Sequence, residues 1–138
     1  MSDVVYTAHV RTEGGRAHGH AVSDDSNLDV RLAYPPALGG DGKGTNPEQL
    51  FAAGYASCFT GALGLVAKNQ HVNLGQHTLD ADVDLIRDPP SFKIGVTLTL
   101  TAPSLDRETA ETLLHAAHEV CPYSKAIRGN VDVALRVA

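Results

Sequence analysis

The sequence predicts an α+β fold in which antiparallel sheets pack around a long buried helix. Several segments alternate apolar and polar residues, which is typical of strands with one buried face. Residues 104–121 instead have the periodicity of an amphipathic helix. Residues 50–67 carry no charge and follow a helix-capping signal, which indicates a helix that is buried.

Length and composition restrict the kinds of protein that this chain can be. Its 138 residues suffice for one core, so we expect a single domain over residues 1–138. A hydrophobic content of 43% argues against disorder, and a net charge of −5 gives no surface for nucleic acid. No basic segment followed by an apolar stretch begins the chain, so we expect a cytoplasmic protein.

The first strands are expected near the N-terminus. Alternation predicts three short strands joined by turns rich in Gly and Asp, at residues 4–10, 16–22 and 28–32. A loop rich in Pro and Gly is expected to follow, at residues 35–44.

The clearest alternation lies in the second half of the chain. Residues 79–85 and 92–100 form two such runs, and turn residues 87–91 between them predict an antiparallel hairpin. Residues 131–137 predict one more strand. The amphipathic helix at residues 104–121 can be capped by Ser104 or Asp106, and Pro122 marks its end.

The uncharged helix has a clear beginning. Asn46 suits the N-cap, Pro47 suits the first helical position, and Gln49 can close a capping box. Residues 50–67 are long enough to span a membrane, but only six of them are Leu, Val or Phe. We therefore expect no membrane span but a helix buried on every side, with a partner subunit covering what one sheet cannot.

Two cysteines, Cys58 and Cys121, are candidates for buried bystanders, metal ligands or a redox couple. Cys58 lies in the middle of the uncharged helix, where apolar neighbours raise the pKa of a thiol. Cys121 lies at the end of a helix, where the dipole opposes a thiolate, although Lys125 and Arg128 follow it. The thiol that lies beside an arginine in a dry pocket becomes the nucleophile. The other thiol can then serve as its resolving partner.

Arg16 is a candidate for that arginine. It follows Gly14 and Gly15, whose flexible backbone lets a loop direct a side chain inward. Glu48 could hold the guanidinium by a bidentate contact. The alternatives are a solvated arginine at a strand end and an acid that complements the helix dipole.

Three blocks of sequence, in order along nearly the whole chain, resemble the organic hydroperoxide resistance (Ohr) branch of the OsmC/Ohr family. They are GGR at residues 14–16, residues 39–59 including GTNPEQLFAAGYASCF, and residues 121–130 with CPYS and RGN. The resemblance implies an intertwined α+β homodimer whose active sites lie at the subunit interface. It also implies a thiol peroxidase that reduces organic hydroperoxides to alcohols without a cofactor or metal.

The resemblance assigns a role to each candidate residue. Cys58 resembles the peroxidatic cysteine and Cys121 the resolving cysteine, while Arg16 and Glu48 resemble the pair that activates the thiolate. It implies a Cys58 sulfenic acid, then a Cys58–Cys121 disulfide. Protein-bound lipoyl groups, or another dithiol, are the implied reductant.

Helix geometry adds an expectation about the dimer. Glu48 and Cys58 are ten residues apart on one helix, which is about 15 Å along its axis. One arginine does not readily bridge that length. If two copies of the helix cross antiparallel near Ala53 and Gly54, Glu48 of one chain lies beside Cys58 of the other.

Three alternatives remain open. A metal-binding protein could use His115, His118 and Cys121, with His18 and His20 as further ligands. A non-catalytic module could hold a lipid-like ligand in an apolar pocket. The osmotically inducible branch of the same family shares the two cysteines and their chemistry.

Overall fold

The structure, a computed structural model, describes residues 2–138 and is α+β, as predicted. The chain divides into two compact units, with the boundary after Leu50, and each unit has its own three-stranded sheet. The long helix α1 (Pro47–Asn69) begins at the end of the first unit and continues through the start of the second.

The first unit is an antiparallel sheet in the order β1–β2–β3, formed by Val10–Glu13, Gly19–Ser23 and Asp29–Leu32. A short 3-10 helix, η1 (Pro36–Leu38), lies inside the predicted loop. Gly19 pairs with Leu32, and Leu32 forms a further bridge with Thr45. The residues that precede α1 are therefore held at the end of the sheet where the β1–β2 turn lies.

Two of the predicted N-terminal strands have other bounds in the structure. The strand predicted at residues 4–10 is replaced by β1, and residues 2–9 form no strand, because alternation does not supply the hydrogen-bonded neighbour that a strand needs. The strand predicted at residues 16–22 begins only at Gly19. Gly14 and Gly15 adopt φ values of 77° and 63°, which turn the chain, so Arg16 lies in this turn and not in β2.

The second unit contains the predicted hairpin. β4 (Thr78–Asp88) pairs antiparallel with β5 (Ser91–Thr101), in a register that places Leu79 opposite Leu100. β6 (Val133–Val137) lies on the other side of β5 but runs parallel to it. The expectation of purely antiparallel sheets is wrong for this pair, because the helices between β5 and β6 carry the chain back before β6 begins.

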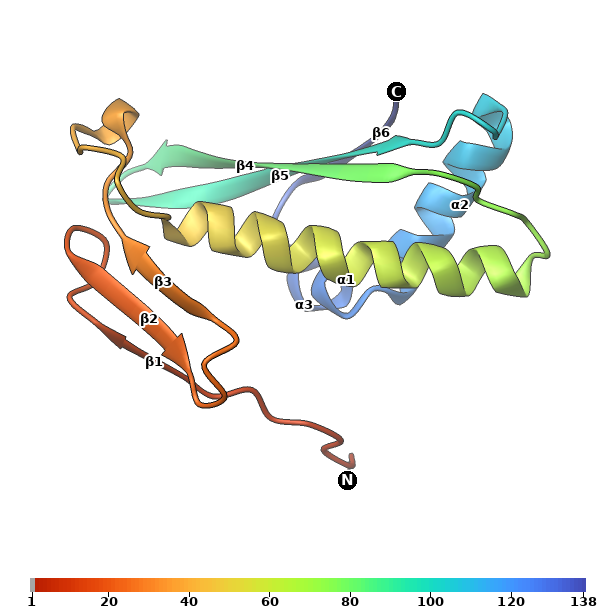
Figure 1. Ribbon diagram of the computed structural model, residues 1–138. Helices are drawn as coiled ribbons and strands as arrows, with labels where there is room; N and C mark the ends of the chain where they lie inside the picture. The colour runs from red at the N-terminus through yellow and green to blue at the C-terminus, as the bar shows by residue number, and fades with distance from the viewer. Residues whose placement is uncertain (1) are drawn as a thin grey trace. The chain divides into compact units, whose positions relative to one another are not determined.

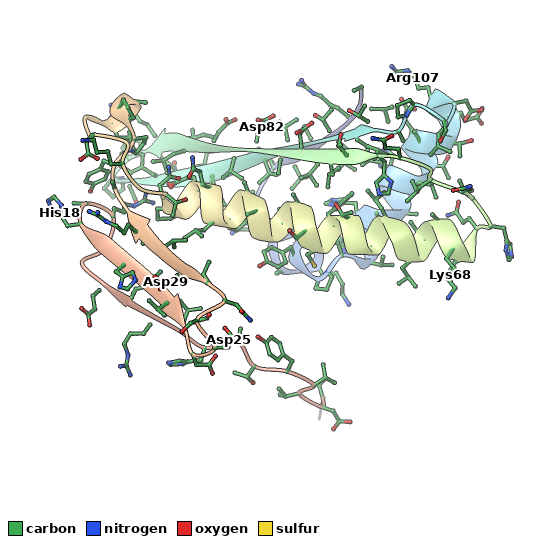
Figure 2. The ribbon with its side chains drawn as sticks, viewed as in Figure 1. His18, Asp25, Asp29, Lys68, Asp82 and Arg107 are labelled. Atoms are coloured by element: carbon green, nitrogen blue, oxygen red, sulfur yellow. The ribbon has the colours of Figure 1, made fainter. Side chains whose placement is uncertain are left out.

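The apolar core of the second unit lies between this sheet and its helices. Helix α1 runs along one face of the β4–β5–β6 sheet (Figure 1), where the buried side chains of β5 include Val96, Leu98 and Leu100. The opposite face of β4 carries acidic residues, and Asp82 points away from α1 (Figure 2). This alternation explains why the strand pattern was readable in the sequence.

The beginning of α1 has the predicted N-cap. The side-chain oxygen of Asn46 accepts a hydrogen bond of 2.9 Å from the backbone N–H of Gln49. Gln49 has another partner than a capping box would give it. Its amide oxygen accepts a 2.7 Å hydrogen bond from the Thr45 hydroxyl. The Asn46 cap and the Thr45 contact together hold the first turn of α1.

Helix α1 is buried on one side only within a single chain. Its buried residues are Tyr55, Phe59, Ala62, Leu63, Val66 and Ala67. An exposed stripe runs along the other side: Ala53, Ser57, Gly61, Gly64, Leu65 and Lys68. The helix has the length and composition of a membrane span, yet its buried residues are part of the core of the second unit. One sheet thus covers only one face of α1, as expected, and the cover of its other face by a partner subunit stays a prediction.

The C-terminal helical region contains two helices where one was predicted. α2 (Arg107–Val120) is capped by Asp106, whose side chain accepts from the backbone N–H of Thr109. A second helix, α3 (Pro122–Ile127), begins directly after Cys121. Pro122 thus ends one helix and begins the next, because its fixed φ suits a first helical position.

Replacing Asn46 by alanine tests the cap of α1. We expect Asn46→Ala to lower the free energy of unfolding by about 1 kcal/mol, because the N–H of Gln49 loses its acceptor. Asn46→Asp is the matched control, since aspartate caps as well as asparagine. Urea unfolding of the three proteins measures the difference, and equal midpoints for Asn46→Ala and wild type would contradict it.

Candidate functional site

The two cysteines lie next to each other in the second unit. Both are free thiols, and the Cys121 Sγ lies 3.7 Å from the Cys58 Sγ, toward which its S–H donates. A disulfide requires a separation of about 2.05 Å between the two sulfurs. A small movement of the two side chains would therefore close the bond.

The two sulfurs differ in access and in position. Cys121 is completely buried, whereas Cys58 is half-buried. Cys121 was expected at a helix end that disfavours a thiolate, but it is both the C-cap of α2 and the N-cap of α3. Cys121 therefore lies at a junction of two helices and not at the single helix end that the sequence predicted.

The surroundings of Cys58 work against its ionisation. Burial is the largest influence and raises the pKa of the thiol, and the neighbouring Cys121 raises it further. The backbone N–H of Tyr123, near the start of α3, acts in the opposite direction. Within residues 51–138 the groups that shift this pKa include no cation, which agrees with the expectation that Cys58 does not activate itself.

Aromatic side chains surround this part of α1. The rings of Phe51, Tyr55 and Tyr123 pack edge-on or tilted, with centroids 5.8–6.3 Å apart. A side chain at Gly54 would place its Cβ only 2.7 Å from the Tyr123 hydroxyl oxygen. Gly54 is therefore small because Tyr123 of the same chain lies over it, a reason that the sequence did not reveal.

Arg16 and Glu48 form the predicted bidentate contact in the first unit. The Arg16 Nη1 and Nη2 donate to the two Glu48 carboxylate oxygens over 3.0 and 2.9 Å. The β1–β2 turn supplies Arg16, and the first turn of α1 supplies Glu48. The bridge between Leu32 and Thr45 holds these two turns at the same end of the sheet.

The ion pair stabilises the charged form of both partners. The hydrogen bonds to Arg16 lower the pKa of the Glu48 carboxyl, although partial burial opposes this shift. The same hydrogen bonds raise the pKa of Arg16. Arg16 is thus no free surface arginine, and its guanidinium is held in one orientation by a carboxylate.

The cations after Cys121 have other positions than the sequence suggested. The Arg128 Nη2 donates to the backbone carbonyl of His118, in the last turn of α2. Lys125 is exposed on α3. Arg128 therefore supports the end of α2, where free carbonyls need donors.

The histidines proposed as metal ligands have other partners. The His118 Nδ1 lies 2.8 Å from the Ser124 hydroxyl, and the His20 Nε2 lies 2.6 Å from Asp29. Among residues 2–138 no group of three or more His, Cys, Asp or Glu side chains could hold a metal ion. The metal-binding alternative therefore has no ligand set in the described part of the chain.

Comparison with known proteins identifies the family. A family model described as OsmC-like protein matches residues 40–136. The chain is 53% identical over 135 residues to the organic hydroperoxide resistance protein OhrB of Bacillus subtilis, which covers 96% of this chain and 98% of that protein. It is 50% identical over 137 residues to the organic hydroperoxide resistance protein of Xanthomonas axonopodis pv. citri, with 98% and 96% covered.

A solved structure agrees with the sequence relatives. The crystal structure of an organic hydroperoxide resistance protein OsmC from Legionella pneumophila matches with a TM-score of 0.93 and 47% identity, and 99% of each chain is covered. The resemblance drawn from the sequence blocks is confirmed over nearly the full length: this chain belongs to the OsmC-like family, among the organic hydroperoxide resistance (Ohr) proteins.

Proposed function

We propose that this protein is a cysteine-based peroxidase that reduces organic hydroperoxides to alcohols. The observation that carries the proposal is the pair of free sulfurs, Cys58 and Cys121, 3.7 Å apart at the edge of an apolar core. The names of its relatives, which concern resistance to organic hydroperoxides, support the same chemistry. A second thiol at this distance suits a reaction that ends in a disulfide.

The reaction has three balanced steps. The Cys58 thiolate attacks the distal peroxide oxygen, the O–O bond breaks, and the alkoxide takes a proton to leave as the alcohol. The Cys121 thiol then attacks the Cys58 sulfenic acid, which forms the disulfide and releases water. An external dithiol reduces the disulfide by two thiol exchanges and becomes a disulfide itself.

Access decides which cysteine meets the peroxide. Cys58 is half-buried and reachable, whereas Cys121 is completely buried behind it. A hydroperoxide that enters from solvent therefore meets Cys58 first. This difference supports attack by Cys58 and resolution by Cys121.

Activation of Cys58 requires a positive charge from outside its own surroundings, since burial raises the pKa of its thiol. The Arg16 guanidinium is the candidate because Glu48 already orients it. Glu48 and Cys58 are about 15 Å apart along α1, so the activating pair comes from a second copy of the chain.

The exposed stripe of α1 suits such a homodimer. Its residue at the midpoint between Glu48 and Cys58 is the small Ala53, and Ser57, one turn later, is also small. Two α1 helices that cross antiparallel at Ala53 bring Glu48 of each chain to Cys58 of the other. The two active sites would then lie at the subunit interface.

The preferred substrates carry carbon groups. Phe51 and Tyr123, which are not fully buried, provide apolar surface on the part of the chain that holds Cys58. Each methylene that such a surface buries contributes about 0.8 kcal/mol, and hydrogen peroxide has none. Alkyl, aryl and fatty-acyl hydroperoxides should therefore react faster than hydrogen peroxide.

The proposed reaction indicates the kind of reductant and the cellular compartment that the protein needs. A dithiol must reopen the disulfide after each turnover, and a protein-bound lipoyl group is a dithiol of this kind. A reaction that depends on reduced cysteines fits the cytoplasm. No metal, nucleic acid or membrane enters this scheme, and the osmotically inducible branch would use the same steps.

Cysteine variants test the reaction. We expect Cys58→Ser to lose consumption of tert-butyl hydroperoxide completely, because it lacks the attacking sulfur. Cys121→Ser should not turn over, and after one equivalent of tert-butyl hydroperoxide it should hold a sulfenic acid that dimedone traps and mass spectrometry detects. Wild type with a lipoyl dithiol should consume tert-butyl hydroperoxide faster than hydrogen peroxide. Full activity of Cys58→Ser would favour the ligand-binding alternative instead.

Mixed dimers test whether the site is shared. Cys58→Ser and Glu48→Ala proteins should each be inactive alone, because one lacks the nucleophile and the other the orienting carboxylate. After subunit exchange, heterodimers should regain activity at the one interface that has both wild-type residues. Two Cys58→Ser preparations that are mixed in the same way provide the control, and persistent inactivity of the heterodimers would assign both residues to one chain.

The pH dependence of thiolate formation tests the role of Arg16. Without the Arg16 cation only the Tyr123 N–H would oppose the effect of burial, so Arg16→Ala should raise the pKa of Cys58. The pH profile of its peroxidase activity should move in the alkaline direction. Arg16→Lys should shift it less, because it keeps the charge. Ultraviolet absorbance of the thiolate reports the titration, and equal curves for wild type and Arg16→Ala would remove Arg16 from the mechanism.

A further inference from the structure

A fully buried hydroxyl lies close to the cysteine pair and has no part in the reaction above. Ser124, in the first turn of α3, is completely buried. Its Oγ lies 2.7 Å from the Tyr55 hydroxyl and 2.8 Å from the His118 Nδ1. One serine thus connects α1, α2 and α3 by a chain of hydrogen bonds, called here the Tyr55–Ser124–His118 chain.

The members of the Tyr55–Ser124–His118 chain lie at fixed sequence distances from the two cysteines. Tyr55 precedes Cys58 by three residues on α1, and Ser124 follows Cys121 by three residues. The Tyr55–Ser124 hydrogen bond and the pair of sulfurs are therefore two adjacent links between the same two segments. Tyr55 and Cys58 lie three residues apart on one face of α1, so the first link limits how far the second can open.

The protons of the chain can be assigned. A serine hydroxyl has one proton, so Ser124 donates to one neighbour and accepts from the other. Burial raises the pKa of Tyr55, which therefore keeps its proton and can donate to Ser124. Burial and the nearby Arg128 lower the pKa of His118, so its ring is neutral and its Nδ1 can accept from Ser124. Every member of the chain is then satisfied.

We propose that the Tyr55–Ser124–His118 chain is a positioning device that keeps Cys121 within reach of the oxidised Cys58 and so protects Cys58 from a second oxidation. The proposal rests on the proposed function. A Cys58 sulfenic acid has two fates: attack by the Cys121 thiol, which forms the disulfide and releases water, or a second hydroperoxide. Oxidation by the second hydroperoxide gives a sulfinic acid and another alcohol, and thiols do not reduce the sulfinic acid back to the cysteine.

The geometry explains why the first fate wins. Disulfide formation needs the sulfurs to approach from 3.7 Å to about 2.05 Å. Cys121 lies at the junction of α2 and α3, and both helices are held, α3 through Ser124 and the end of α2 through His118. Arg128 closes the same junction by donating to the His118 carbonyl. A held thiol attacks with a high effective concentration.

The test separates the two oxidation steps. We expect Ser124→Ala to slow disulfide formation after one equivalent of tert-butyl hydroperoxide by about tenfold or more, because the effective concentration of Cys121 falls. Intact mass after excess hydroperoxide should show a larger sulfinic fraction. Tyr55→Phe should also slow disulfide formation and raise the sulfinic fraction. It replaces Ser124→Ala as the test if that variant does not fold. His118→Asn, which keeps a polar group in place of Nδ1, should stay closer to wild type than His118→Leu.

A second measurement needs no hydroperoxide. Equilibrium with a glutathione buffer gives the effective concentration of Cys121 toward Cys58, which Ser124→Ala should lower. Thr112→Val is the matched control, since it removes a hydroxyl that bonds only within α2. An unchanged closure rate, sulfinic fraction and effective concentration in Ser124→Ala would overturn the positioning role. A wild-type protein that consumes no hydroperoxide, but closes its disulfide in glutathione, would instead overturn the proposed function.

Discussion

The burial of the Cys58 thiol is the constraint on which the chemistry of this protein depends. An apolar environment gives a nucleophilic sulfur access to carbon-containing substrates, but it also raises the pKa of the thiol. The second unit by itself offers only the Tyr123 backbone N–H against this effect. A buried sulfur of this kind therefore needs a charge that is positioned in advance, since a freely moving lysine or arginine would lose entropy each time it entered.

The Arg16–Glu48 pair has the properties that such a charge requires. Glu48 occupies two of the five guanidinium N–H groups of Arg16 and leaves three that, in the proposed reaction, can donate to a sulfur or a peroxide oxygen. The carboxylate weakens the field of the cation, but it also fixes the plane in which the remaining donors point. In the proposed reaction orientation matters more than strength, because charge that develops on the peroxide oxygens would be stabilised by donors already aimed at it.

Much of this arrangement could be predicted from local sequence signals, and the exceptions depend on long-range contacts. The β4–β5 hairpin and the Asn46 cap arise from neighbouring residues, so their patterns are visible in the chain. The Arg16–Glu48 contact was predictable from residue chemistry and family resemblance, although Arg16 lies in a turn and not in a strand. The parallel pairing of β5 and β6 was not predictable, because its direction depends on where α2 and α3 lead the chain.

The short helix α3 shows most clearly why part of the site could not be predicted from the sequence. Pro122 is a valid signal for the end of α2, and only the folded chain shows that it also begins α3. That one element places Cys121 at an N-cap, directs the Tyr123 N–H toward Cys58, and buries Ser124 against Tyr55 and His118. These partners come from segments up to 69 residues apart, so no local pattern encodes them. Because a helix of six residues has little stability of its own, α3 must owe its position to these contacts, and Cys121, the cysteine that we propose resolves the reaction, shares that dependence.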